Sequence, residues 1–331
     1  MIYNSATELI GHTPLLRLNN LASALGLPFA PLAKLEYLNP AGSTKDRAAL
    51  FMIDEAERNG QLQKGGTIIE PTSGNTGVGL SMICAIRGYR LILTMPETMS
   101  QERISLLRAH DAEVVLTSAE EGMTGSVAKA QQLHDEIAGS IILGQFSNPA
   151  NPQAHYATTA QELWEDTGGE ITAVVAGIGT GGTICGIGRR LKELGDIKII
   201  GYEPATSPLI TEGKSGSHKL QGIGANFIPE NYDQEVVDEV LTVKNEDAIA
   251  MARLMAQTEG ILVGFTGGGA ISAACQLIRD RYQQPMVRQD HQPTTQNPQP
   301  ATQNPQPTAN IIAILPDGGE RYLSTDLYQA I

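Results

Sequence analysis

One lysine of this chain stands where it could act as a nucleophile. Lys45 lies in residues 39–47 (NPAGSTKDR), where turn-forming residues are followed at once by a helix-like run. A lysine amine forms Schiff bases with carbonyl compounds, and it becomes a better nucleophile where its surroundings lower its proton affinity. On the Lys-Asp-Arg triplet alone, a solvated charge at a helix N-terminus is the more common role.

Three glycine-rich turns could hold anionic groups. Residues 71–77 (PTSGNTG) follow a predicted strand that ends at Glu70, and unpaired amides with small hydroxyl side chains suit a carboxylate or a phosphate. An ordinary capped turn fits that pattern equally well. Residues 177–183 (GIGTGGT) follow another predicted strand, and residues 264–270 (GFTGGGA) again combine a hydroxyl with glycines. Close packing of a helix on the sheet is the alternative explanation for the last turn.

The turn at 177–183 also fits a dinucleotide-binding fingerprint. Gly177, Gly179 and Gly182 match G-x-G-x-x-G, and Glu203 closes the next predicted strand, at about the 20-residue distance that such a fold requires. An NAD-dependent oxidoreductase is therefore the competing class. The interleaved threonines instead supply hydroxyl donors for a terminal phosphate monoester, and a dinucleotide site leaves Lys45 without a role.

Short β-branched runs alternate with helix-period segments along the chain. This order predicts parallel strands joined by crossover helices, in an α/β architecture that binds ligands at the carboxyl ends of its strands. Turn residues at 145–153 predict a boundary between two lobes. The predicted strands are 67–70, 91–94, 113–116, 141–143, 171–176, 197–201 and 311–315.

The composition is that of a globular chain with an acidic balance of charge. The formal net charge is −13, from 23 Lys+Arg and 36 Asp+Glu, which argues against nucleic acid as a partner because phosphate backbones require a basic face. No apolar run is long enough to span a bilayer, and the N-terminus has no secretory pattern, so we expect a cytoplasmic protein without membrane partners. Cys84, Cys185 and Cys275 have no metal-ligand spacing, and we expect buried free thiols and no metal.

Residues 283–310 differ from the rest of the chain in composition. They are rich in Gln, Pro, Thr and Asn and contain a tandem heptapeptide, TQNPQPA followed by TQNPQPT. Such a segment cannot build a core, so we expect a Pro/Gln-rich inserted surface loop. The repeat has no Pro-x-x-Pro spacing, which disfavours a role as a ligand of proline-recognition domains.

In this order along the chain, the motifs resemble the cysteine synthase (O-acetylserine sulfhydrylase) family of pyridoxal phosphate enzymes, which have the tryptophan synthase β fold. The resemblance rests on the segments at 39–47, 72–77 and 179–183, on HKLQGIGA at 218–225, and on Leu315-Pro316 with GERYLST at 319–325. It covers nearly the whole chain apart from the insertion. It implies an α/β protein of fold type II, with two lobes that are each a mostly parallel twisted sheet flanked by helices, and a cofactor in the cleft. The implied lobes are a smaller, mobile substrate-binding lobe at 36–149 and a larger cofactor phosphate-binding lobe at 1–35 plus 150–331.

The resemblance also implies a role for each site residue. Lys45 would form the internal Schiff base with pyridoxal 5'-phosphate and act as acid and base at the substrate Cα. Asn75 would bind the phenolic oxygen of the cofactor, and Thr266 would face its pyridine nitrogen. The remaining implied contacts are with the cofactor phosphate (Gly179, Thr180, Gly181, Gly182 and Thr183) and with the substrate (Thr72, Ser73, Gly74, Asn75, Thr76, Gln145 and Gly224).

The implied reaction is β-replacement of acetate in O-acetyl-L-serine by sulfide, through a cofactor-bound aminoacrylate. The neutral hydroxyl of Thr266 does not favour a protonated ring, which suits elimination. Asn226 stands where the family has a glycine, and Thr266-Gly267-Gly268 replaces Ser-Ser-Gly, so a thiosulfate-using cysteine synthase, a cystathionine synthase or a diaminopropionate synthase remains an alternative. The resemblance also implies a homodimer, the usual state of the family, and the C-terminal tail of serine acetyltransferase as a candidate partner.

Other residues have patterns that favour structural roles. Met99, Met123 and Phe146 could line a cleft, but core packing is more common for such side chains. His155 and His218 have no partner that the sequence identifies, and we assign neither to catalysis.

Overall fold

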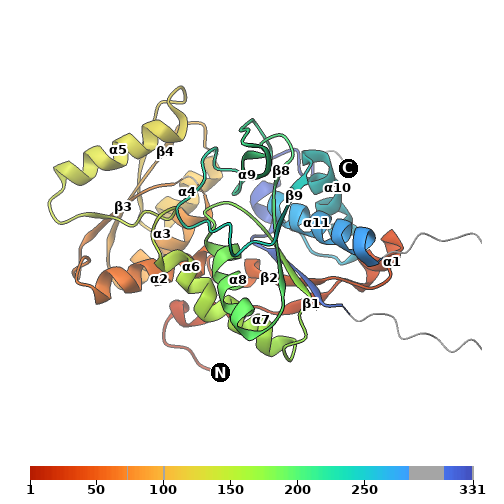
Figure 1. The fold of residues 1–331 in the computed structure, drawn as a ribbon. Helices are drawn as coiled ribbons and strands as arrows, with labels where there is room; N and C mark the ends of the chain where they lie inside the picture. The colour runs from red at the N-terminus through yellow and green to blue at the C-terminus, as the bar shows by residue number, and fades with distance from the viewer. Residues whose placement is uncertain (73, 100, 283–308, 330–331) are drawn as a thin grey trace, which may run out of the picture.

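A computed structural model of the chain describes residues 1–72, 74–99, 101–282 and 309–329. Helices and strands alternate around two separate sheets (Figure 1). One sheet has four strands in the order β5-β4-β3-β6, and the other has six in the order β1-β2-β10-β7-β8-β9. Every pairing is parallel except that of β1 with β2. The predicted α/β fold with two mostly parallel sheets flanked by helices is confirmed.

The four-stranded sheet is buried on both faces. Ile68 packs in the core formed with α2 and α3, whereas the next residue, Ile69, packs with Ala130 of α5 on the opposite face. Successive strand residues point to opposite faces, so a sheet covered on both sides requires continuous apolar runs. The elements here are β3 (Thr67–Pro71), β4 (Arg90–Pro96), β5 (Glu113–Thr117) and β6 (Ile141–Ile142), with α2 (Lys45–Arg58), α3 (Asn75–Arg87), α4 (Gln101–Ala109) and α5 (Gly122–Glu136).

The six-stranded sheet is covered in the same way. Val174 packs with the α8 side of the sheet, and Val175 packs with α10 and α11 on the other side. Its strands are β1 (Leu15–Arg17), β2 (Leu32–Leu35), β7 (Ala173–Gly177), β8 (Lys198–Pro204), β9 (Glu239–Val243) and β10 (Ile311–Leu315). The covering helices are α8 (Gly182–Leu194), α10 (Asn245–Thr258) and α11 (Phe265–Tyr282).

The remaining elements are short. They are α1 (Asn19–Leu25), α6 (Ala150–Ala154), α7 (Ala160–Asp166) and α9 (Leu209–Glu212), a π-helical turn at His155–Thr159, and 3₁₀ turns that include η2 (Glu36–Leu38) and η4 (Gly319–Tyr322). All seven predicted strands are present, but the sequence analysis did not predict β1, β2 and β9. In β2, the sequence Leu-Ala-Lys-Leu places a lysine in a fully buried strand, and a charged residue at such a position hides the apolar pattern.

The domain boundaries stay a prediction. The break predicted at 145–153 follows β6 and includes most of α6, on the path from one sheet to the other. The predicted insertion at 283–310 lies outside the described residues, except for its last two positions. Cys84, Cys185 and Cys275 are buried free thiols, as expected.

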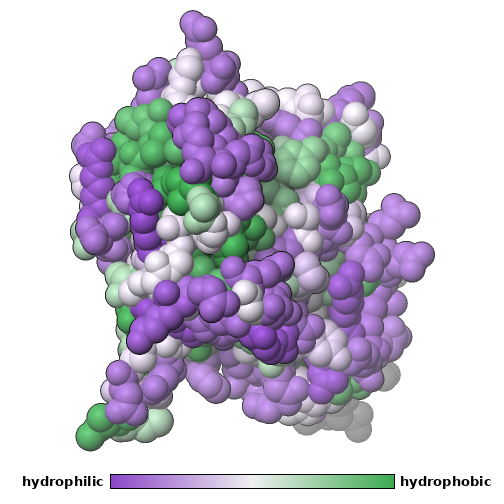
Figure 2. All heavy atoms as spheres, turned by 90° about the vertical axis from the view of Figure 1, so that its left-hand side faces the viewer, coloured by the Kyte–Doolittle hydropathy of each residue, from purple (hydrophilic) through white to green (hydrophobic). Residues whose placement is uncertain are grey.

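The surface on the side of the four-stranded sheet is largely polar. Figure 2 shows that hydrophilic residues cover most of this face and that apolar residues gather in separate patches. Over the described part of the chain, the helices are too short or too polar to cross a bilayer.

Candidate active site

A cleft of about 630 Å³ is lined by residues at the ends of strands from both sheets. Its wall includes Pro71 at the end of β3, Gly177 at the end of β7 and Pro316 just after β10, together with Gln145 shortly after β6. This arrangement follows from parallel strands, whose carboxyl ends meet at one edge of each sheet. The volume is in the range of sites that bind cofactors and small substrates.

Lys45 lies in the cleft wall as the first residue of α2. Its backbone amide donates to the Ser43 hydroxyl at 3.2 Å, and the amide of Thr44 donates to the Pro316 carbonyl at 2.8 Å. Burial lowers the pKa of the Lys45 amine, and the nearby charge of Asp317 opposes this change. A lowered pKa increases the fraction of neutral amine, the form that attacks a carbonyl or accepts a proton.

The first glycine-rich turn and Gln145 form one polar corner of the cleft. Thr72, Gly74, Asn75, Thr76 and Gln145 all line it, while Ser73 lies outside the described residues. The Thr76 hydroxyl donates to Gln145 Oε1 at 2.6 Å, and the Gly74 amide donates to Thr72 Oγ1 at 3.3 Å. Thr72 and Gln145 accept these bonds through oxygen, so the Thr72 hydroxyl hydrogen and the Gln145 amide N–H groups can still donate to a ligand. Because α3 begins at Asn75, the partial positive charge of its N-terminus adds to these donors. The corner is suited to a carboxylate.

The second glycine-rich turn places the N-terminus of α8 at the cleft. Gly179, Thr180, Gly181 and Thr183 line the cavity, and Gly182 lies beside them. Gly181 has a φ of +80°, and a Cβ at Gly179 would stand 2.3 Å from the Gly222 carbonyl oxygen. Only glycine accommodates both conditions, so the chain can approach a ligand closely here. Hydroxyls and helix-start amides together fit the phosphate end of a cofactor.

Thr266, in the first turn of α11, is buried at the cleft. The glycines after it serve packing: a Cβ at Gly268 would stand 2.1 Å from the Ala248 carbonyl oxygen of α10, and one at Gly269 would stand 2.8 Å from the Tyr202 ring of β8. The packing explanation of this turn is therefore correct for the glycines, and the threonine hydroxyl belongs to the cleft.

His155 contacts Thr183, the last residue of the glycine-rich turn at 177–183. Its Nε2 lies 3.2 Å from Thr183 Oγ1, and its Nδ1 lies 2.9 Å from Thr159 Oγ1. Burial lowers the pKa of this imidazole to about 3, so the ring is neutral near pH 7. Its Nε2 can therefore donate a hydrogen bond to the Thr183 hydroxyl or accept one from it, depending on the tautomer. The sequence analysis assigned His155 no partner, because the two residues meet only when α8 packs against the π-helical turn.

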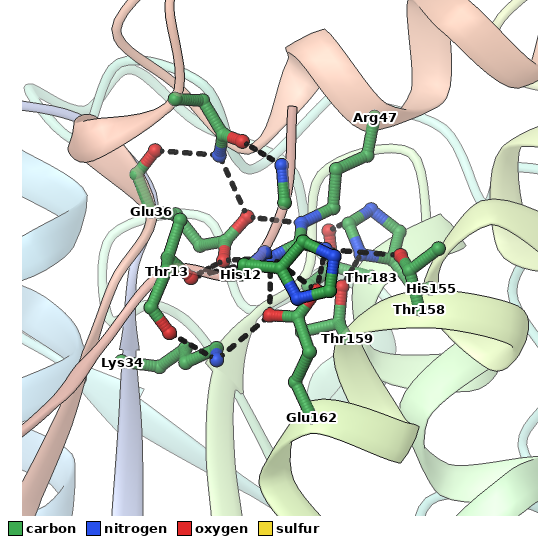
Figure 3. Close-up of polar contacts among 12 residues, drawn as sticks. His12, Thr13, Lys34, Glu36, Arg47, His155, Thr158, Thr159, Glu162 and Thr183 are labelled. Atoms are coloured by element: carbon green, nitrogen blue, oxygen red, sulfur yellow. Dashed lines mark hydrogen bonds and ion pairs between the residues drawn. The ribbon is translucent and has the colours of Figure 1, made fainter. Parts of the chain in front are cut away.

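A buried cluster of charges begins two residues after Lys45 (Figure 3). Arg47 donates to both carboxylate oxygens of Glu36 at 2.8 Å and to those of Glu162 at 2.5 and 2.8 Å. Lys34 lies 2.8 Å from Glu162, so two cations balance two carboxylates. Burial alone would raise the pKa of Glu36, but the charge and hydrogen bonds of Arg47 lower it to about 2. The cluster joins α2 to η2, β2 and α7.

The buried carboxyl of Asp46 should make the stability of the protein depend on pH. Burial raises the pKa of its carboxyl from 3.8 to about 7, although the amide of Ala41 donates to it at 2.6 Å. The folded state therefore binds this proton more tightly than the unfolded chain, and the group's contribution to stability is lost as pH rises from about 4 to about 7. Asp46→Asn removes this loss, so its stability relative to the wild type should increase by about 2 to 3 kcal/mol between roughly pH 5 and pH 8.

Urea denaturation at the two pH values measures the Asp46 effect. The control is Asp247→Asn, which changes an exposed carboxylate in the first turn of α10 and should keep the wild-type pH dependence. An Asp46→Asn protein with the same pH dependence as the wild type would contradict the prediction.

Some cleft residues were not expected from the sequence. Met99, Met123 and Phe146, for which core packing was favoured, line the cleft, and Met99 also packs against the core beside it. Gly224 lies between two lining residues, Ile223 and Ala225, and its carbonyl lies 3.1 Å from the Nε2 of His218. Arg321 lines the cleft and is one of the residues of the 319–325 motif to which the sequence gave no role.

Glu203 does not have the surroundings of a ribose-binding acid. Its two carboxylate oxygens accept the backbone amides of Ile210 and Thr211 at 2.8 and 2.9 Å and the Thr211 hydroxyl at 2.6 Å. The carboxylate is thus engaged at the start of α9, which weakens the dinucleotide interpretation of the glycine turn.

Comparisons with known proteins agree with this geometry. A family model described as "Pyridoxal-phosphate dependent enzyme" matches residues 6–287. A cysteine synthase of Staphylococcus aureus (strain N315) is 44% identical over 327 residues, which are 98% of this chain and 97% of that protein. The crystal structure of a cysteine synthase from Entamoeba histolytica has a TM-score of 0.90 at 38% identity and covers 100% of this chain and 92% of that one. An O-ureido-L-serine synthase structure has a TM-score of 0.88 at 34% identity, with coverages of 100% and 96%.

Proposed function

The chain belongs to the family of pyridoxal-phosphate dependent enzymes, and we propose that its cleft carries out a β-replacement reaction. It is a pyridoxal phosphate-dependent transferase of the cysteine synthase class, in which sulfide replaces the acetate of O-acetyl-L-serine. The observation that carries the assignment to individual residues is that Lys45, Asn75 and the N-terminus of α8 line one cleft.

We assign each part of the cofactor to a group of residues that line the cleft. When bound, pyridoxal phosphate supplies an aldehyde that links reversibly to an amine and a ring that withdraws negative charge from the substrate Cα. In our proposal the turn from Gly179 to Thr183 holds the phosphate with its amides and hydroxyls, and Asn75 donates to the ring oxygen. Thr266 offers the ring nitrogen a neutral hydroxyl, so the ring need not be protonated.

Lys45 carries the proton chemistry. Its amine, with a pKa lowered by burial, would hold the cofactor aldehyde when no substrate is present. Once the substrate amine has taken that place, the free Lys45 amine would accept the proton from the substrate Cα as acetate leaves Cβ, and would return it to Cα after sulfide has added at Cβ.

The turn at 72–76 and Gln145 hold the substrate carboxylate. The hydrogen bond from Thr76 to Gln145 Oε1 at 2.6 Å orients the Gln145 amide. Glu70 accepts the backbone amides of Gly144 and Gln145 at 3.0 and 3.2 Å and so fixes this segment against β3. Contacts of Ser73 and Gly224 with the substrate complete the proposed set.

The alternatives are not favoured. For an NAD-dependent oxidoreductase, the candidate ribose ligand Glu203 already accepts hydrogen bonds from Ile210 and Thr211, and the family match points to another cofactor. For the related β-replacement enzymes, the curated relatives at 44% identity are described as cysteine synthases.

Product analysis tests the proposed function. Purified protein loaded with pyridoxal phosphate should form cysteine from O-acetyl-L-serine and sulfide, and should use sulfide faster than thiosulfate, homocysteine or ammonia. Borohydride should fix the cofactor to the protein. A protein that binds NADH and forms no product from O-acetyl-L-serine with any of these nucleophiles would overturn the proposal.

We further propose a cytoplasmic homodimer that can bind the C-terminal tail of a serine acetyltransferase. These proposals rest on the family resemblance. Light scattering of the purified protein, and a titration with a peptide of that tail in competition with O-acetyl-L-serine, test the assembly and the partner.

A further inference from the structure

Asp317 lies in the loop after β10, next to the lining residue Pro316 but not in the lining itself. Ser43 pairs with Asp317 in an isolated β-bridge, and the Gly264 amide donates to the Asp317 carbonyl oxygen at 3.2 Å. The backbone of Asp317 is therefore held from both sides, and the residue is only 1% exposed. No motif in the sequence analysis included it.

Two donors converge on one oxygen of the Asp317 carboxylate. Asn75 Nδ2 donates to Oδ2 at 2.7 Å, and the Tyr322 hydroxyl donates to the same oxygen at 2.5 Å. Among the described residues, Oδ1 has no hydrogen-bond partner. It occupies space left by Gly264, where a Cβ would stand 2.2 Å from it. A carboxylate with an unpaired oxygen is costly to bury, so packing alone gives no reason for an aspartate here.

The Asn75 amide is held between this carboxylate and a guanidinium. Its Oδ1 accepts from Arg321 Nη1, while its Nδ2 donates to Asp317. A carboxylate ion only accepts and a guanidinium only donates, so a single orientation of the amide satisfies both contacts. One N–H of Nδ2 is used by Asp317, which leaves the second N–H on a residue that lines the cleft.

The charges around Asp317 oppose the effect of its burial. Burial raises the pKa of the carboxyl, whereas the hydrogen bonds from Tyr322 and Asn75 and the positive charges of Arg321 and Arg103 lower it. The net direction is a raised pKa, because burial is the largest of these effects. The orientation of Asn75 rests on its contacts: Arg321 can only donate to Oδ1, which leaves Nδ2 to donate to Asp317.

We propose that Asp317 is a positioning residue for Asn75: it fixes the amide so that the second N–H points to the ring oxygen of the cofactor. The inference rests on the proposed function, in which Asn75 contacts that oxygen. Asp317 is not part of the cleft lining, so we place its effect on the cofactor ring oxygen in its contact with Asn75. Its charge also opposes the lowering of the Lys45 pKa, and the double-variant cycle separates that effect from the one through Asn75.

Dialysis of the holoenzyme variants against buffer measures the dissociation constant of pyridoxal phosphate. Asp317→Ala should raise this constant by about 10-fold or more, since the Asn75 amide loses its hydrogen bond to the carboxylate and is then held by Arg321 alone. It should also shift the visible absorbance band, which responds to the donor at the ring oxygen. Asp317→Asn keeps the volume and one acceptor oxygen and should restore most of the affinity. The control is Asp326→Asn, an exposed carboxylate paired with Lys219, which should match the wild type.

A double-variant cycle separates this role from a purely structural one. If Asp317 acts through Asn75, then Asp317→Ala in an Asn75→Ala background should weaken cofactor binding no further. Additive losses would overturn the proposal, as would wild-type affinity and an unchanged spectrum for Asp317→Ala. Should Asp317→Ala fail to fold, Asp317→Asn replaces it in both comparisons, with a loss of about 3-fold expected.

The failure of this inference differs from a failure of the proposed function. If the wild-type protein does not retain pyridoxal phosphate, the function itself is wrong. If the wild type and Asn75→Ala behave as proposed but Asp317→Ala has no effect, only the positioning role is wrong.

Discussion

Lys45→Ala is expected to lower the turnover of O-acetyl-L-serine by roughly a thousand-fold or more, because one side chain supplies both the link to the cofactor and the base at Cα. The same substitution should remove the visible absorbance that depends on the amine, and borohydride should no longer fix the cofactor to the protein. Steady-state kinetics and absorbance of the purified variant measure both effects. A fully active, yellow Lys45→Ala protein would exclude the assignment.

Two further variants show whether the amine or its charge matters. Lys45→Arg keeps the positive charge, but a guanidinium stays protonated and cannot act as the base, so this variant should be as inactive as the alanine variant. Lys64→Ala changes an exposed lysine before β3 and should retain wild-type turnover. Substantial activity in Lys45→Arg would indicate an electrostatic role instead of a chemical one.

The second large effect is expected on stability. Arg47→Met should reduce the free energy of unfolding by about 3 to 5 kcal/mol at neutral pH, because the carboxylates of Glu36 and Glu162 stay buried without their main partner. Glu36 is fully buried, and Arg47 is only 1% exposed, so water cannot replace the lost contacts. The shift of the urea midpoint measures the change.

The matched control for Arg47→Met is a surface pair of the same chemistry. Arg90 contacts Glu113 with distances of 2.6 and 2.9 Å, but both side chains are about half exposed, and Arg90→Met should cost at most about 1 kcal/mol. In Glu36→Gln/Arg47→Met, the loss should be smaller than in Arg47→Met alone because one unpaired charge is removed. Equal effects of Arg47→Met and Arg90→Met would contradict the role of burial.

The local features of the site were predictable because each has a short-range signal. The Lys45 segment and the three glycine turns are recognised from turn formers, hydroxyls and a helix start within about ten residues. The seven predicted strands are recognised from continuous apolar runs, which a sheet buried on both faces requires. The missed strand β2 shows the limit of this signal, since buried Lys34 interrupts it and is stabilised by Glu162, far away in the sequence.

By itself, the sequence determined the α/β class, the order of the elements and the candidate residues that carry a reactive amine or a glycine turn. Only the tertiary structure decided which residues support them: Asp317 meets Asn75 across 242 positions, and Arg47 meets Glu162 across 115. The physical reason is that a buried polar group needs a partner, and no local periodicity specifies a partner that arrives from another strand end or helix. The proposed chemistry of Lys45 can thus be inferred from its neighbours in sequence. The orientation of Asn75, in contrast, depends on Asp317 and Arg321, which come from the C-terminal part of the chain.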